Sequence, residues 1–223
     1  MTNEDPNWRP KAIVFDLLTA LLDSWSLWDA STPFKTTEEG RRWRKQYLEL
    51  TFGAGAYSPS TAYESLVGQS ARDVGLPDSA PAALVQNWQQ LQAWPEVGQV
   101  LPELKARGYK LGVVTNCSAE LGPVAVRRAE QSVGGGFSFD AAITAEDSGF
   151  YKPAKEAYEA ILPRLGVHLD EILFVAGSAG DVQGATDAGM RVVWHNRVGL
   201  AKKGDAIAWR EGKTLDEALH GFL

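Results

Sequence analysis

KAIVFDLL, residues 11–18, is a short apolar run with β-branched residues, and it contains a single acidic side chain, Asp16. Such a run is typical of a strand that is buried on both faces of a sheet. Three further runs of this kind occur at residues 110–116, 171–177 and 190–195. Helical patterns lie between the runs, at residues 96–107, 119–131, 153–165 and 179–189. This alternation predicts an α/β fold, in which a parallel sheet carries helices on both faces.

Residues 22–95 break this alternation, because they are helical in pattern and contain no convincing strand. The clearest helices are residues 38–52 and 82–94. Five of the eight tryptophans fall in this segment: Trp25, Trp28, Trp43, Trp88 and Trp94. We therefore predict a helical cap domain at residues 22–95, inserted after the first strand of a core domain made of residues 11–21 and 96–223. An aromatic cap of this kind could also form the surface of a homodimer.

The composition excludes several classes of partner. Hydrophobic residues make up 44% of the 223 positions, as in ordinary globular proteins, and no apolar run approaches the ~18 residues of a membrane span. A net charge of -6 without a run of Lys or Arg predicts no binding to nucleic acid or to an anionic membrane. A single cysteine and a polar, acidic N-terminus without an apolar signal core indicate a cytoplasmic protein.

Polar residues stand at four points where the predicted fold places the ends of strands. They are Asp16, Thr115 with Asn116, Lys152, and Ser178 with Asp181. Because open parallel sheets bind their ligands beyond the carboxyl ends of the strands, we expect these side chains to lie close together. A carboxylate there can act as a nucleophile and form an ester, which water then cleaves. A lysine within ~4–6 Å would keep that carboxylate ionised.

The other polar residues fit supporting roles in the same chemistry. Thr115 and Asn116 can hydrogen-bond a substrate oxyanion, and Asp181 can orient Lys152 or a hydrolytic water. Simpler roles stay open, since an aspartate at a strand end often caps a helix and a lysine often lies at the surface. Cys117 is expected to be a packed thiol beside the site. The three histidines, His168, His195 and His220, lack the spacing of metal ligands and are expected to be structural or exposed.

The order of these motifs over residues 11–198, with an insert after the first, resembles the haloacid dehalogenase superfamily. The resemblance implies a Rossmann-like core, with Asp16 as the catalytic nucleophile and Lys152 and Asp181 as its catalytic partners. Phosphatases of this superfamily carry a second aspartate, the general acid, two residues after the nucleophile, and a further magnesium-binding acid in the last motif. This chain has Leu18 and Gly177 at those positions. The resemblance therefore implies a hydrolase without a metal or another cofactor.

The metal-free L-2-haloacid dehalogenases are the most similar branch. Residues 41–51, RRWRKQYLELT, are similar to their cap helix, and Arg44 matches the arginine that reaches the substrate or the leaving group. Tyr158 matches a tyrosine of that branch, and residues 194–199 match the segment after its last motif. The chain departs from the branch at four positions, where the dehalogenases carry Thr, Ser, Asn and an aromatic residue: Ala20, Ala176, Ser178 and Gly180.

The resemblance implies that the partner is a small 2-substituted carboxylic acid. A related group that opens the ring of L-azetidine-2-carboxylate is similar in its first and last motifs, so the leaving group, a halide or a ring nitrogen, stays open. An amine would need a proton from Asp23, Tyr47 or water. The predicted substrate-binding residues are Leu17, Leu18, Trp25, Arg44, Tyr47, Thr115, Asn116, Tyr158 and Ser178. Two alternative functions are a magnesium-dependent phosphatase with unusual motifs and a non-catalytic binding protein that kept the fold.

Overall fold

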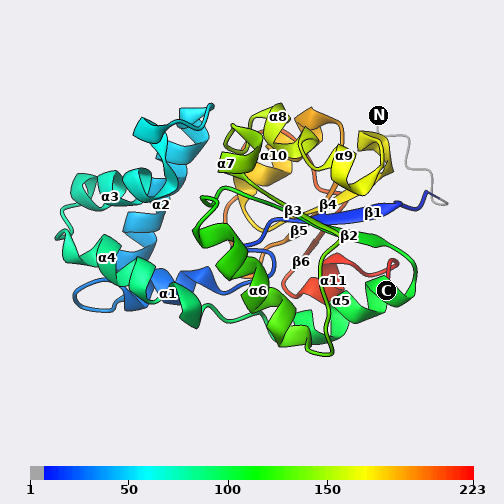
Figure 1. Cartoon of the computed structure of the whole chain (residues 1–223), viewed down its shortest axis with the longest axis horizontal. Helices are drawn as coiled ribbons and strands as arrows, with labels where there is room; N and C mark the ends of the chain where they lie inside the picture. Colours follow the sequence, from blue (N-terminus) through cyan, green and yellow to red (C-terminus); the bar gives the residue numbers. More distant parts are fainter. Residues whose placement is uncertain (1–7) are drawn as a thin grey trace.

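The computed structural model describes residues 8–223 and contains a six-stranded parallel sheet with the strand order β3-β2-β1-β4-β5-β6 (Figure 1). The strands are β1 (Ala12–Phe15), β2 (Lys110–Thr115), β3 (Ala141–Thr144), β4 (Ile172–Ala176), β5 (Arg191–His195) and β6 (Arg210–Gly212). β1 pairs with β2 on one side and with β4 on the other. The predicted α/β fold is therefore confirmed, and the residue after β1, Asp16, lies in the middle of the carboxyl edge of the sheet.

The strands differ from their predicted ranges in ways that the sequence explains. The predicted strand 11–18 ends early, at Phe15, because backbone N–H groups of the next turn bond to the Asp16 side chain instead of to a strand. Two strands were not predicted, β3 and β6. Both lie at the edges of the sheet, and their sequences AAIT and REG lack the long apolar run of a central strand.

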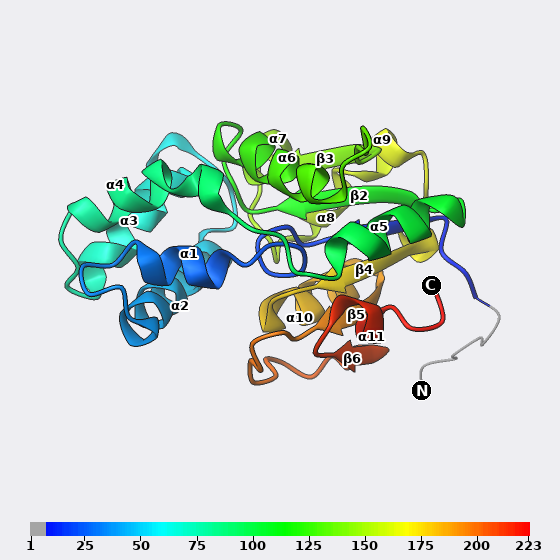
Figure 2. The ribbon, with the colours of Figure 1, turned by 90° about the horizontal axis from the view of Figure 1, so that it is seen from below.

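Helices cover both faces of the sheet, with α5, α6 and α11 on one face and α8, α9 and α10 on the other (Figures 1 and 2). The helices around the sheet are α5 (Val97–Ala106), α6 (Leu121–Val133), α7 (Ala145–Ser148), α8 (Lys155–Glu159), α9 (Leu162–Leu165), α10 (Ala179–Ala188) and α11 (Leu215–Ala218). The prediction of one helix at residues 153–165 is wrong. Pro163 cannot donate a backbone hydrogen bond to the carbonyl of Glu159, so the segment splits into α8 and α9.

Four helices follow β1 and gather at one end of the molecule (Figures 1 and 2). They are α1 (Ser24–Ala30), α2 (Thr37–Ala54), α3 (Tyr63–Asp73) and α4 (Ser79–Gln86). α2 contains the predicted helix 38–52, but the predicted helix 82–94 is too long, because α4 ends before Asn87, a weak helix former. None of the helices described in residues 8–223 is long and apolar enough to cross a membrane.

Aromatic rings form the interior of this helical group. Trp28 packs on Trp43 and on Tyr47 with ring centroids 4.5 and 5.1 Å apart. Tyr63 continues the stack to Tyr47 at 5.3 Å and to Trp88 at 5.8 Å. All five rings are buried, so these tryptophans are core residues of this helical group, α1 to α4, which we call the cap. An isolated bridge between Leu22 and Ala93 joins the two ends of the segment. The exact domain boundaries and the homodimer stay predictions.

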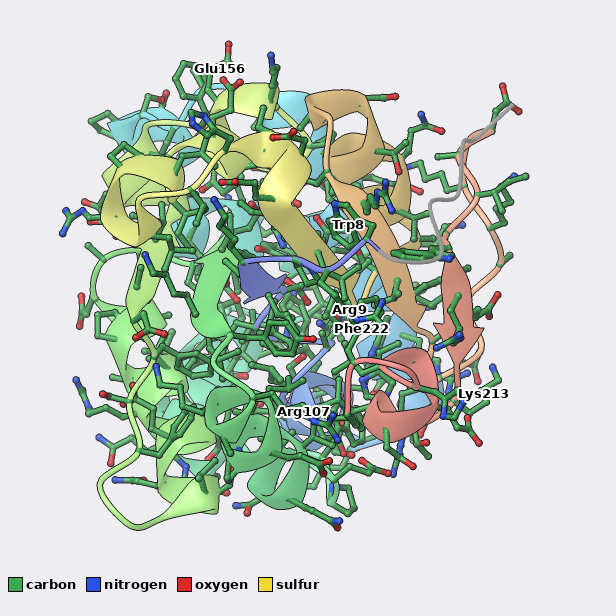
Figure 3. All side chains as sticks on the ribbon, turned by 90° about the vertical axis from the view of Figure 1, so that its right-hand side faces the viewer. Trp8, Arg9, Arg107, Glu156, Lys213 and Phe222 are labelled. Atoms are coloured by element: carbon green, nitrogen blue, oxygen red, sulfur yellow. The ribbon has the colours of Figure 1, made fainter. Side chains whose placement is uncertain are left out.

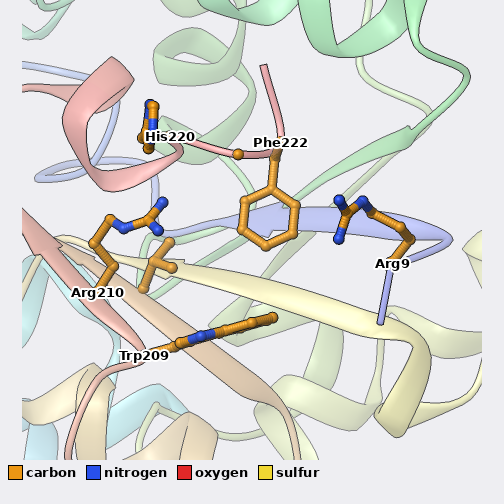
Figure 4. A pocket seen from close by; sticks show the side chains of 7 residues that line it. Arg9, Trp209, Arg210, His220 and Phe222 are labelled. Atoms are coloured by element: carbon orange, nitrogen blue, oxygen red, sulfur yellow. The ribbon is translucent and has the colours of Figure 1, made fainter. Parts of the chain in front are cut away.

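A hollow of about 290 Å³ is lined by Arg9 and Phe222, which lie near one another in Figure 3, on the side of the molecule opposite these helices. Figure 4 shows the ring of Phe222 pointing into it toward Trp209, with Arg9 and Arg210 on either side. Arg9 precedes β1 and Trp209 precedes β6, so the hollow belongs to the amino ends of the strands. Parallel sheets place their chemistry at the opposite, carboxyl ends, which is where Asp16 lies.

Candidate active site

Asp16 is buried directly after β1, and the turn that follows it holds its carboxylate. Its Oδ2 accepts a hydrogen bond from the Thr19 hydroxyl, from the Thr19 N–H at 3.0 Å and from the Ala20 N–H at 3.4 Å. Its Oδ1 accepts a single hydrogen bond, from Lys152 Nζ at 2.8 Å, so this oxygen keeps a lone pair. Thr19 was not predicted from sequence as a site residue. It could have been found from its spacing, because a threonine three residues after an aspartate is typical of side chains that bond to each other within one turn.

Lys152 joins the two predicted catalytic carboxylates. Its Nζ lies 2.8 Å from Asp16 Oδ1 and 3.0 Å from Asp181 Oδ2, and its side chain is 2% exposed. Asn116 fixes the backbone of Lys152 from both sides: its Oδ1 accepts from the Lys152 N–H at 2.8 Å, and its Nδ2 donates to the Lys152 carbonyl at 3.2 Å. The amide of Asn116, predicted to contact substrate, therefore also positions the lysine.

Asp181 is held on the far side of the lysine. The Tyr158 hydroxyl donates to its Oδ1 at 2.8 Å, and the Ser178 hydroxyl lies 3.1 Å from its Oδ2. Ser178 also caps α10, because its Oγ accepts from the Asp181 N–H at 3.2 Å. The hydrogen bonds thus form a continuous network from Tyr158 through Asp181 and Lys152 to Asp16.

The network sets the charges of its members. Burial alone would raise the pKa of Asp16, but the Lys152 ammonium and the bonds from Lys152 and Thr19 outweigh it and lower that pKa. Burial raises the pKa of Asp181, and the nearby negative charge of Asp16 raises it further. Together they outweigh the Lys152 ammonium, which lowers it. The two carboxylates raise the pKa of Lys152 in spite of its burial. Asp16 is therefore the carboxylate that stays ionised, and Asp181 is the one that protonates more readily.

The cap places a second cation opposite this network. Arg44, on α2, is 2% exposed and stacks on the Trp25 ring at 4.0 Å. Its Nε and Nη1 are buried without a hydrogen-bond partner, and so is the hydroxyl of Tyr47 one helical turn later. Burial lowers the pKa of Arg44, but a guanidinium stays charged at neutral pH. Buried polar groups are nearly always paired, so these donors are free to bond a group that enters the site.

A small pocket of about 30 Å³ separates the two halves. Nine of the predicted site residues line it: Asp16, Leu18, Arg44, Tyr47, Thr115, Asn116, Lys152, Ser178 and Asp181. Three residues that also line the pocket were not predicted from sequence: Thr19, Leu48 and Phe52. Leu48 and Phe52 lie one and two helical turns after Arg44 on α2, so the period of a helix could have found them.

Three predicted substrate-binding residues do not line the pocket. Leu17 is fully buried, the Tyr158 hydroxyl bonds to Asp181, and Trp25 lies beneath Arg44. Tyr158 and Trp25 can therefore act on a substrate only through the residues that they hold. Asp23, a suggested proton donor, instead caps α1 by accepting from the Ser26 N–H at 3.1 Å.

The structure leaves no room at Gly177 for the magnesium-binding acid that phosphatases of the superfamily carry at this position. A Cβ at this position would collide with the Thr19 hydroxyl and the Ala20 N–H, so the turn after Asp16 already occupies the space of a side chain. In the described residues 8–223, no cluster of three or more His, Cys, Asp and Glu side chains is arranged to hold a metal ion. Independence from metal stays a prediction, which a chelator tests directly.

Cys117 and His195 take no direct part in this network. Burial raises the pKa of the Cys117 thiol to about 12, so it stays protonated beside the site, where the Thr115 hydroxyl contacts its sulfur at 3.3 Å. Burial lowers the pKa of His195, whose Nδ1 lies 2.8 Å from the Ala20 carbonyl. Both residues support the backbone around the site.

A family model described as haloacid dehalogenase-like hydrolase matches residues 10–189 of this chain. With the fold and the strand-end motifs, this match shows that the chain belongs to the haloacid dehalogenase-like hydrolase family. It is an enzyme of that superfamily.

Individual relatives and structures agree with this placement. The chain is 31% identical to the (S)-2-haloacid dehalogenase of Pseudomonas sp. (strain YL) over 198 residues, which cover 85% of this chain and 84% of that enzyme. A solved L-2-haloacid dehalogenase matches the fold with a TM-score of 0.82 at 25% identity, over 96% of this chain and 99% of that chain. A phosphatase of Mycobacterium tuberculosis (strain CDC 1551 / Oshkosh) is also 31% identical over 166 residues, 74% of this chain and 75% of the phosphatase. Identity alone therefore does not decide between the two reactions.

Proposed function

We propose that this hydrolase uses Asp16 to displace a substituent from the α-carbon of a small 2-substituted carboxylic acid. The observation that supports this most strongly is the pairing of the Asp16–Lys152 nucleophile with Arg44, whose buried donors have no partner in the protein. Such donors suit an anion, either a departing halide or the substrate carboxylate. A phosphatase would instead need an acid at position 18, where the pocket wall is an aliphatic leucine.

In the first step, Asp16 Oδ1 forms a bond to the α-carbon as the bond from that carbon to the leaving group breaks. A halide departs with its electron pair toward Arg44, and the configuration at the α-carbon inverts. Lys152 and Thr19 hold the carboxylate in one orientation, so little reorganisation is needed for attack. Thr115 and the backbone amide at Leu18, which both line the pocket, bind the carboxylate of the substrate.

In the second step, water adds to the side-chain carbonyl carbon of the Asp16 ester. The bond from that carbon to the alkoxy oxygen then breaks, which releases a 2-hydroxy acid and a proton and restores the Asp16 carboxylate. Asp181 lines the pocket and is the group that receives the proton from water, since burial raises its pKa. The inversion made in the first step is kept in the product.

L-azetidine-2-carboxylate is a second substrate for the same site. The four departures from the dehalogenase pattern, Ala20, Ala176, Ser178 and Gly180, fit this substrate as well as a halogenated acid. Attack at its α-carbon breaks a ring C–N bond, and the departing nitrogen needs a proton. Tyr47 lines the pocket with an unpartnered hydroxyl, and burial raises its pKa, so the phenol stays protonated and can donate a hydrogen bond to the departing nitrogen, which takes its proton from water.

A substrate panel tests the proposal. It contains L-2-chloropropionate, haloacetates, L-azetidine-2-carboxylate and p-nitrophenyl phosphate, each with and without a chelator. We expect at least one of the acids to be turned over. A chelator should not change this turnover, and Asp16→Asn should lower it by about 10⁴-fold. The matched control is Asp78→Asn, an exposed aspartate without a side-chain capping bond. Chelator-sensitive hydrolysis of the phosphate would support the phosphatase, and no turnover at all would support the binding protein.

A further inference from the structure

The mouth of the pocket is formed by three residues. Leu48, Phe52 and Asn116 are half-exposed, whereas every other residue that lines the pocket is buried. The cavity behind them is small, about 30 Å³. The side chains at its mouth therefore bear directly on which ligands fit.

Phe52 closes this mouth by resting on Gly180, at the start of α10. A Cβ built on Gly180 would lie 2.6 Å from Phe52 Cζ and 3.1 Å from its Cδ2, so no larger residue fits under the ring in this position. The backbone does not require glycine, because Gly180 does not adopt a positive φ. Glycine is also less favourable than alanine in a helix. Room for the Phe52 ring is thus the reason that the structure gives for glycine at this position.

A third residue completes the contact across the mouth. Lys203, in the loop between β5 and β6, has its Nζ 5.2 Å from the centroid of the Phe52 ring, within the range of a cation–π contact. The single ring of Phe52 therefore joins cap helix α2 to core helix α10 and to this loop. The exposed ammonium of Lys203 also puts a positive charge beside the opening through which an acid would pass.

We infer that Phe52 is the specificity-determining residue of this site, and that its seat on Gly180 limits the substrate to short-chain 2-substituted acids. The ring lines the same pocket as Asp16 and Lys152 and lies at its mouth, so it limits the space left for the alkyl chain of a longer acid. Acids of two or three carbons are admitted and acids of five or six carbons are excluded. The identity of the ligand as an acid rests on the function proposed above.

A thermal double-mutant cycle tests the contact without any turnover. Gly180→Ala should lower Tm in the wild-type background, because the new Cβ displaces the ring. In the Phe52→Ala background the same change should raise Tm by about 2 °C, since alanine favours the helix. The control is Gly68→Ala, at an equally half-buried glycine of α3 whose added Cβ meets only Arg72 Nη1 at 3.5 Å, and it should act alike in both backgrounds. An effect of Gly180→Ala that is the same in both backgrounds would overturn the inference.

Ligand length tests the function of the contact. We would measure kcat/KM for L-2-chloro acids of three to six carbons, and calorimetric binding of the unsubstituted acids of the same lengths. Phe52→Ala should raise the ratio of the six-carbon to the three-carbon ligand by about tenfold or more in each series. Phe34→Ala, at a ring that is 78% exposed, is the matched control and should leave the ratio unchanged.

The two readouts separate this inference from the proposed function. Turnover with the same length dependence in wild type and Phe52→Ala would overturn the role of Phe52 and leave the proposed function standing. Binding with a length limit that depends on Phe52, but without turnover of any acid, would support the role of Phe52 and overturn the proposed function. Neither turnover nor binding of any acid would overturn both.

Discussion

The two halves of the site are equally buried, but they differ in how their polar groups are paired. On the core side, Asp16, Lys152 and Asp181 are joined by hydrogen bonds of 2.8–3.0 Å. On the cap side, Arg44 and Tyr47 keep donors without partners. The charged groups of the core half are therefore paired without a ligand, whereas the donors of the cap half have no partner until a ligand binds. Removing a core residue should damage both stability and catalysis, while removing a cap residue should damage catalysis alone.

The largest effect is expected for Lys152→Met. The change leaves two carboxylates buried without their cation, and breaking a buried ion pair in this way costs about 3–5 kcal/mol of the free energy of unfolding. Activity should fall by about 10³-fold or more, because Asp16 loses its orientation and its lowered pKa. Denaturant unfolding and steady-state kinetics measure the two effects.

Lys105→Met is the matched control for this change. Lys105 also pairs with an aspartate, at 2.5 Å from Asp140 Oδ2, but both side chains are 36% exposed. Solvent-exposed pairs contribute only about 0–1 kcal/mol, so this variant should keep nearly full stability and activity. Equal stability losses in the two variants would contradict the claim that burial makes the Lys152 network important.

The cap side is tested by Arg44→Met. We expect kcat/KM to fall by about 10²–10³-fold, because an anion in the site loses its charged donors. The free energy of unfolding should stay unchanged or rise by about 1 kcal/mol, since the variant removes buried donors that the protein leaves unpaired. Arg41→Met, at an exposed arginine of the same helix, should change neither quantity. A stability loss above about 2 kcal/mol for Arg44→Met would show that its donors are satisfied within the protein.

A smaller effect is expected for Tyr158→Phe, which removes the 2.8 Å bond to Asp181 without touching the pocket. The change should cost about 1 kcal/mol of stability and lower kcat about tenfold, with little change in KM. It should also raise the pKa of Asp181 further, because the lost hydrogen bond favoured the ionised form. Tyr109→Phe, at a half-buried tyrosine outside the site, is the control. A change in KM alone would place Tyr158 in contact with substrate.

The smallest effect is expected from pH. Lys152 lowers the pKa of Asp16 below its ordinary value of 3.8, and the two carboxylates raise that of Lys152 above 10.5. The pH profile of kcat/KM should therefore be flat between about pH 5 and 9. Asp16 contributes to stability above the pKa that it has in the unfolded chain, and this contribution is lost as the pH falls through its lower pKa in the folded protein. Lys152 contributes below its unfolded pKa, and its contribution is lost as the pH rises through its higher pKa in the folded protein. A step near pH 6–7 would contradict this profile, and it would show that ester formation depends on the ionisation of Asp181, whose pKa is raised, or of a group outside the network.

The core side was predictable from sequence because its residues follow strands. Once the runs at 11–18, 110–116 and 171–177 are taken as parallel strands, their carboxyl ends must meet, and this places Asp16, Asn116 and Asp181 together. The edge strands β3 and β6 lacked that signal, since short strands of alanine or polar residues do not form an apolar run. Thr19 was within reach through its spacing from Asp16.

The cap side was harder to predict, because its residues contact the core only through tertiary packing. The helix at 38–52 was found from its pattern, but no local signal shows that Phe52 rests on Gly180, a residue 128 positions later in the chain. The position of Trp25 under Arg44 likewise depends on how α1 packs on α2. Such contacts depend on the relative placement of elements, which periodicity does not specify.

The most direct test of the aspartyl ester is a single turnover in oxygen-18 water, with enzyme in excess over L-2-chloropropionate or L-azetidine-2-carboxylate. Mass spectrometry of the peptide that contains Asp16 and of the released 2-hydroxy acid then locates the label. We predict that Asp16 gains one oxygen-18 atom while the first product carries none. An unlabelled Asp16 together with a labelled product would mean that water attacks the substrate directly, and it would contradict the central claim.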